Sequence, residues 1–246
     1  MAPPNENELF QYSLISALLD GVASTGLPVA ELLSHGDHGL GTFRYMVGEM
    51  IILDGELYQM KADGTVSPID PAAASDPPVV APFAQVTRFE PTATTAAALA
   101  SKDEVSGALA RLLPGSRNHF VAVRLEGTFR SVTVRTAAGQ TEPRQSVREV
   151  GRNQVSHTFE DVEGTVVGFL SPAFVEGGIG VPGIHLHFIT RDRTRGGHVL
   201  ALETSGEVQV RAAELTKMHV ELPVGDEEFD AAPLRGDAAA VKEVEG

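Results

Sequence analysis

The sequence of 246 residues contains no cysteine. This absence excludes disulfide bonds, zinc sites built on thiolates and cysteine nucleophiles at the same time. Without thiolates, nitrogen ligands would suit zinc and also iron, nickel or copper.

Basic residues are scarce as well. The chain has 19 lysines and arginines against 33 aspartates and glutamates, which gives a formal net charge of −14. Such an acidic surface repels phosphate backbones, and the arginines are scattered singly instead of forming a basic stripe. We therefore expect no nucleic-acid partner.

Long apolar runs and nucleotide-binding or serine-nucleophile motifs are also missing. No run approaches membrane-spanning length, and the N-terminal segment MAPPNENELFQYSL lacks a basic region followed by an apolar one. We expect a cytoplasmic protein with no membrane association. The pair Gly39-x-Gly41 alone is not a phosphate-binding loop, and no Gly-x-Ser-x-Gly elbow occurs.

The patterns that are present predict a few helices and many strands. Apolar spacing predicts helices over residues 8–22 and 28–36, and a Ser-x-x-Glu capping box predicts another over 101–115. Two Asp-Gly pairs between short β-prone runs predict a hairpin meander within 42–69. Residues 119–136 are expected to form two β segments around Glu126-Gly127, and β patterning resumes after the polar stretch 137–154.

This order of elements predicts an α+β fold with mixed, largely antiparallel β-sheets and two closely packed subdomains. We expect the subdomain boundary near residues 150–165. An N-terminal α/β subdomain with a large sheet would comprise residues 1–160. A C-terminal β subdomain of residues 161–246 would carry the functional site and a C-terminal tail.

Three of the eight histidines gather in the stretch GIHLHFITRDRTRGGHVL, residues 183–200. His185 and His187 share a strand face because side chains at i and i+2 point the same way. If residues 191–197 close a hairpin that sets His198 opposite Ile189, all three imidazoles lie on one face, whereas a one-residue slip would separate them. Three converging imidazoles with an open fourth position are typical of a catalytic zinc site.

The segments around this cluster resemble the zinc-dependent α-acetolactate decarboxylase family. The family pattern His-Leu-His-Phe-Ile-Thr followed by Gly-Gly-His-Val-Leu is present as HLHFIT and GGHVL with the same interval. Further resemblances are LFQYSLISALL near the start, GLGTF, GEM and LDG within 39–59, AVRLEGTFRSVTVRT at 122–136 and VEGTVVGF at 162–169. The resemblance covers nearly the whole chain.

The resemblance implies site residues as well as an activity. His185, His187 and His198 match the family's zinc ligands, while Glu49 in GEM and Arg135 in VTVRT match its active-site glutamate and arginine. Taken by themselves, Glu49 and Arg135 would pass for a solvent-facing carboxylate and half of a surface ion pair.

The family also uses a glutamate from its extreme C-terminus. Ungapped alignment from HVELP places that residue at Glu245, with Glu243 two residues away. The tail that carries both glutamates is otherwise dissimilar to the family and would by itself pass for a solvated acidic end.

The implied reaction is decarboxylation of 2-acetolactate to acetoin by a homodimeric lyase. A zinc ion on the three histidines would stabilise the enediolate, Arg135 would orient the departing carboxylate, and Glu49 or Glu245 would supply the proton.

Three alternatives remain open from the residues alone. A small domain of plant and prokaryotic DNA-associated proteins also carries a His-x-His strand followed by Gly-Gly-His, and there the module would bind metal without catalysis. A cupin-like metalloenzyme would usually place a glutamate four or five residues after its second histidine, where this chain has Arg191 and Asp192. A purely structural metal site is the third.

Overall fold

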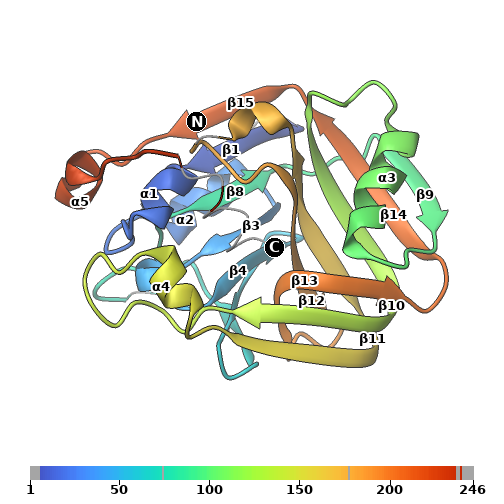
Figure 1. Ribbon diagram of the computed structural model, residues 1–246, viewed down its shortest axis with the longest axis horizontal. Coiled ribbons are helices and arrows are strands. Elements are labelled where there is room, and N and C mark those ends of the chain that lie inside the picture. Colours follow the sequence, from blue (N-terminus) through green and yellow to red (C-terminus); the bar gives the residue numbers. More distant parts are fainter. Residues whose placement is uncertain (1–5, 74, 177, 237–238, 240–246) are drawn as a thin grey trace.

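Two β-sheets that pack against each other form the body of the molecule (Figure 1). The computed structural model describes residues 6–73, 75–176, 178–236 and 239. The predicted class, mostly antiparallel β-structure with a few helices, is confirmed. Within these ranges no helix is long and apolar enough to cross a membrane.

The first sheet has seven strands in the order β15-β1-β8-β3-β4-β5-β6. Their bounds are β1 (Glu8–Tyr12), β3 (His38–Thr42), β4 (Glu49–Leu53), β5 (Glu56–Met60), β6 (Val66–Ile69), β8 (Ala84–Thr87) and β15 (Lys217–Glu221). The predicted meander is confirmed as β4, β5 and β6. Two short strands, β2 (Leu27–Pro28) and β7 (Val80–Ala81), form a separate pair.

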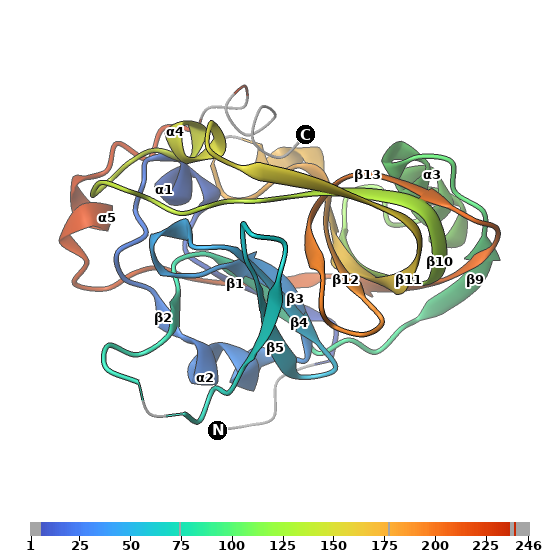
Figure 2. The ribbon, with the colours of Figure 1, turned by 90° about the horizontal axis from the view of Figure 1, so that it is seen from below.

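The second sheet has six strands in the order β11-β12-β13-β10-β14-β9. Their bounds are β9 (Ala93–Ala97), β10 (Phe120–Thr136), β11 (Val155–Ser171), β12 (Gly183–Thr190), β13 (Gly196–Thr204) and β14 (Val208–Leu215). Because β11 also pairs with β10, the strands β10, β11, β12 and β13 form a closed ring of pairings. Figure 2 shows the curved path of β10 and β11, which helps to close this ring. The closure leaves these strands little freedom to slide.

The helices are short and lie around the sheets (Figure 1). They are α1 (Ile15–Leu19), α2 (Val29–Leu32), α3 (Lys102–Leu112), α4 (Val147–Gly151) and α5 (Glu227–Ala231). The predicted cap of α3 is present, since the Ser101 side chain accepts a hydrogen bond from the Glu104 amide. The predicted helix over 28–36 is present as α2 followed directly by a 3-10 helix over Leu33–His35.

The predicted helix over 8–22 is wrong in its first half. Residues 8–12 form β1, which pairs in parallel with β15 and antiparallel with β8, and the helix α1 begins only at Ile15. The strand is buried between partners from residues 84–87 and 217–221. Sheet pairing with distant segments therefore overrides the local helical spacing.

The predicted pair of β segments around Glu126-Gly127 is also wrong. Residues 120–136 form one strand, because Glu126 and Gly127 both pair with β11 instead of making a turn. A Cβ atom at Gly127 would lie 2.7 Å from Val208 Cγ1. The glycine thus permits the close passage of β14.

The expected subdomain boundary at 160/161 falls inside β11, and the two subdomains stay a prediction. The sheets partition the chain differently: strands within 8–87 join 217–221 in one sheet, and strands within 93–215 form the other. The chain passes between the sheets in the short segments 88–92 and 216.

Candidate active site between the two sheets

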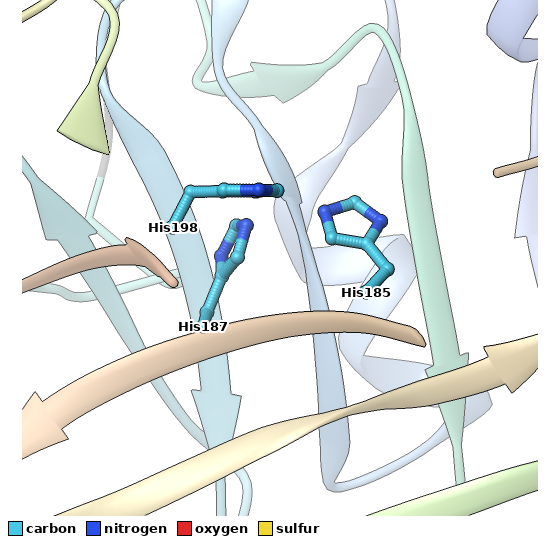
Figure 3. Close-up of side chains that lie close together, drawn as sticks. All are labelled: His185, His187 and His198. Carbon is cyan, nitrogen blue, oxygen red and sulfur yellow. The ribbon is translucent and has the colours of Figure 1, made fainter. Parts of the chain in front are cut away.

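The three histidines of the sequence cluster meet on the β12–β13 hairpin. His185 and His187 belong to β12 and His198 to β13, and their rings point toward one another (Figure 3). Ring centroids are 4.9–5.4 Å apart, and one nitrogen from each residue lies within 4.8 Å of the others. All three side chains are buried.

The hairpin register differs from the expected one by two residues. His198 lies opposite His187, not Ile189. Because two residues are a full period of a strand, the shift leaves all three imidazoles on one face. The predicted gathering of the histidines is confirmed although the predicted register is wrong.

The loop between the two strands explains the register. Asp192 accepts hydrogen bonds from the hydroxyls of Thr190 and Thr194 and from the Thr194 amide, and the Thr190 amide donates to the Arg195 carbonyl. These bonds close a loop of residues 191–194, shorter than the expected 191–197. An aspartate that satisfies its own loop in this way is a common turn device.

Two of the buried imidazoles, His185 and His198, are neutral near pH 7. Burial lowers the pKa of His185 to about 3, and the positive charges of Lys102 and Arg135 act in the same direction. Burial together with Arg135 also lowers the pKa of His198 well below its ordinary value. Neutral imidazole is the form that binds a metal ion, so protons do not compete for these nitrogens at neutral pH.

His187 has a fixed tautomer. Its Nδ1 lies 2.6 Å from the Met50 carbonyl oxygen, which can only accept, so Nδ1 carries the proton. Nε2 is then the nitrogen whose lone pair can bind a metal ion, and it lies 3.8 Å from Glu49 Oε2. An N–H bond from a metal-binding histidine to a carbonyl is a usual way to orient the ring. Three buried imidazole nitrogens in this arrangement fit a divalent metal ion.

Glu49 and Arg135 lie in the same pocket as the histidines. Glu49 begins β4 in the first sheet, whereas Arg135 is near the end of β10 and directly opposite His198. Both are buried, contrary to the exposed positions that each residue would suggest by itself. The pocket thus combines a carboxylate from one sheet with a guanidinium and three imidazoles from the other.

The C-terminal prediction cannot be placed. Glu245 and Glu243 lie outside the described residues.

The sequence patterns did not predict the rest of the pocket wall. Its apolar part consists of Ile15, Leu18, Met46, Phe83, Ala137, Val147 and Val150. The last two residues belong to α4, which lies in a stretch without a predicted helix. The Ser146–Glu149 capping box that begins α4 was a readable signal for it. An apolar wall of this kind disfavours water next to the polar groups of the pocket.

A second missed residue is Gln154, whose side-chain oxygen accepts a hydrogen bond of 3.1 Å from Arg135 Nη1. No sequence pattern marks a lone glutamine after a short helix.

Comparison with known proteins gives a consistent family match. The family described as alpha-acetolactate decarboxylase matches residues 9–236. The chain is 41% identical to the alpha-acetolactate decarboxylase of Methanosarcina mazei over 225 residues, which cover 91% of this chain and 75% of that one. It is 38% identical to the Klebsiella aerogenes protein of the same name over 243 residues, covering 98% and 90%.

The fold agrees with this match. The crystal structure of alpha-acetolactate decarboxylase from Bacillus subtilis strain 168 superposes with a TM-score of 0.89 at 34% identity, covering 97% of this chain and 99% of that one. The non-catalytic DNA-associated module and the cupin are therefore not favoured. The chain belongs to the alpha-acetolactate decarboxylase family.

Proposed function

We propose that this protein decarboxylates 2-acetolactate to acetoin in the pocket between the two sheets, with a zinc ion held by His185, His187 and His198. The observation that carries the proposal is the buried set of three imidazoles beside one carboxyl group and one guanidinium, in a chain of the decarboxylase family. The same set argues against a purely structural metal site, because a structural site needs neither of the two charged groups at its edge.

The reaction requires an electron pair to be stabilised and then protonated. Loss of CO2 from the substrate carboxylate leaves the bonding electrons on the former C2, next to the ketone, and one proton completes acetoin. When bound, a divalent ion supplies Lewis-acid stabilisation of that negative charge. The apolar wall of the pocket strengthens all electrostatic interactions there by keeping water away.

Arg135 is the residue we assign to the carboxylate. Its guanidinium is buried, lines the pocket and lies on the strand beside His198. A planar guanidinium can hold a carboxylate by two parallel hydrogen bonds, which fixes the plane of the group that departs.

Glu49 is the described residue we assign to proton transfer. Its carboxyl group lines the pocket next to His187 and comes from the opposite sheet. A donor fixed on one side of the planar carbanion would protonate one face and yield a single acetoin enantiomer. Glu245 remains the second candidate for this role.

The remaining partner assignments are also proposals. We propose a homodimer, in line with the family resemblance and with the prevalence of symmetric dimers. We propose a cytoplasmic location and no nucleic-acid partner, and the net charge of −14 supports the latter.

The test is the production of CO2 and acetoin from racemic 2-acetolactate by purified protein. Activity should disappear on chelation and return with zinc, and elemental analysis should find about one metal ion per chain. Add-back of manganese, iron, cobalt or nickel in parallel would identify the preferred ion. A fully metallated preparation that forms no acetoin would refute the proposal and favour the non-catalytic metal module.

A further inference from the structure

A glutamine side chain is hydrogen-bonded to the pocket arginine. Gln154 Oε1 accepts a 3.1 Å hydrogen bond from Arg135 Nη1. Arg135 is 5% exposed and Gln154 is half-buried, so this bond is partly shielded from water. A shielded hydrogen bond to a charged group is stronger than an exposed one and restricts the orientation of the guanidinium.

A backbone hydrogen bond and the adjacent strand pairing fix the position of Gln154 beside Arg135. It follows α4, and its amide donates to the Gly151 carbonyl. Two residues later Ser156 pairs with Arg135 itself in the β10–β11 ladder. Gly151 lines the pocket, and a Cβ there would lie 4.0 Å from Gln154 Oε1. Gln154 therefore lies at the junction of the α4 rim and the strand that borders Arg135.

The chemical type of the residue is informative. A carboxamide oxygen accepts a hydrogen bond without carrying a charge, whereas a glutamate at the same place would neutralise the guanidinium. A neutral acceptor orients Arg135 without neutralising its positive charge.

We propose that Gln154 is a positioning residue that orients Arg135 toward the substrate carboxylate while preserving its charge. The inference rests on the proposed function, because it assumes that Arg135 binds that carboxylate.

Two nearly isosteric substitutions separate orientation from charge. Gln154→Met removes the acceptor, and we expect KM for 2-acetolactate to rise about threefold because the guanidinium loses one constraint. Gln154→Glu keeps an acceptor but adds a competing negative charge, and we expect KM to rise about tenfold or more. In both variants kcat should stay within about twofold of the unsubstituted protein.

The chain offers a matched control pair. Gln209 is exposed and accepts a 2.8 Å hydrogen bond from Arg211 Nε, away from the pocket. Gln209→Met and Gln209→Glu should leave KM unchanged. Metal content and thermal midpoint should be equal in all four variants, which excludes loss of structure as the cause.

A second readout does not depend on turnover. Calorimetric binding of 2-hydroxyisobutyrate, an unreactive 2-hydroxycarboxylate, should weaken in the order unsubstituted, Gln154→Met, Gln154→Glu. An active protein whose two Gln154 variants match it in KM and in this affinity would overturn the inference. An unsubstituted protein that forms no acetoin would instead overturn the proposed function.

Discussion

At the residue scale, His187 connects the two sheets within the pocket. Its Nδ1 donates to the Met50 carbonyl of β4 while its ring joins the imidazoles of β12 and β13. The first sheet thereby orients a proposed metal ligand that the second sheet carries. A carbonyl partner of this kind raises the basicity of the metal-binding nitrogen.

Replacing His187 with alanine should remove bound metal and activity together. Two imidazoles do not hold a divalent ion as three do, so we expect metal occupancy to fall at least about tenfold and kcat/KM at least about a hundredfold. Elemental analysis and acetoin formation would be measured side by side. His119→Ala is the control, because His119 is exposed and pairs with Glu214 at 2.6 Å. A His187→Ala protein that is active without metal would contradict the proposed chemistry.

Arg135 can be tested by a substitution that retains its charge. Arg135→Lys lacks the planar fork that matches a carboxylate, so kcat/KM should fall about tenfold to a hundredfold while metal content is unchanged. The matched control on the same strand is Arg130→Lys, where an exposed arginine pairs with Glu203 at 3.1 Å. Equal kinetics for the two lysine variants would show that Arg135 does not bind the carboxylate.

The burial of His38 predicts part of the loss of folding stability at acid pH. It lies in β3, stacked 4.5 Å from Phe89, and burial lowers its pKa to about 3. Between the unfolded value near 6.5 and about 3, the unfolded chain binds a proton that the folded chain does not. The stability that depends on neutral His38 is therefore complete above about pH 6.5 and is lost as pH falls toward 3.

His38→Gln should reduce this loss of folding stability at acid pH. Denaturant unfolding at a series of pH values should show a smaller loss of unfolding free energy between about pH 6.5 and 3 than in the unsubstituted protein. His219→Gln, at an exposed position, should keep the full slope. Identical slopes for all three proteins would mean that His38 does not titrate as its burial indicates.

At the scale of elements, close contact between β11 and β12 fixes the position of His185, the first of the three proposed metal ligands. Gly168 in β11 lies opposite Leu186, between His185 and His187. A Cβ at Gly168 would lie 2.1 Å from the His185 carbonyl oxygen. Any side chain here must push β12 away and displace the proposed metal ligands with it.

Gly168→Ala should accordingly destabilise the fold and weaken metal binding. We expect a loss of about 2–4 kcal/mol in unfolding free energy and a measurable rise in the metal dissociation constant. Gly206→Ala is the control, since no atom lies within 4 Å of a Cβ built there. The idea fails if Gly168→Ala matches that control in stability.

At the scale of the whole molecule, β1 and β15 join the two ends of the described chain. They pair in parallel from Glu8↔Lys217 to Tyr12↔Glu221. Tyr12 is buried at this junction, and burial, with Asp226 and Glu221 nearby, raises the pKa of its phenol to about 12.

This raised pKa predicts a loss of folding stability at alkaline pH. Above the unfolded value near pH 10 the unfolded chain loses the phenolic proton while folded Tyr12 retains it, so stability falls as pH rises from about 10 to 12. Tyr12→Phe should remove that part of the decline in denaturant unfolding. Tyr45→Phe, whose tyrosine is 43% exposed, should not. An unchanged loss of stability at alkaline pH in Tyr12→Phe would contradict the assignment.

Much of the site could be predicted from local sequence. The strand period places His185 and His187 on one face, and an even register shift cannot remove His198 from that face. The Asp-Gly pairs and the Ser101 cap likewise act through neighbouring residues, so β4, β5, β6 and α3 form where the sequence indicates.

Other features depend on contacts that local patterns do not encode. Residues 8–12 become a strand because partners from residues 84–87 and 217–221 are available, and β10 continues through Gly127 because β11 pairs with it on both sides of that residue. Such pairings join positions far apart in sequence, and their free energy outweighs local preference.

By itself the sequence determined the donor set: a chain without cysteine that gathers three histidines on one hairpin face, with segments that match a decarboxylase family. Only the tertiary structure decided what surrounds those donors. Packing of the first sheet on the second brings Glu49 and the Met50 carbonyl to His187, and the α4 turn brings Gln154 to Arg135. The physical reason is that burial and long-range contact, which set tautomer, charge and orientation, arise only when distant segments pack together.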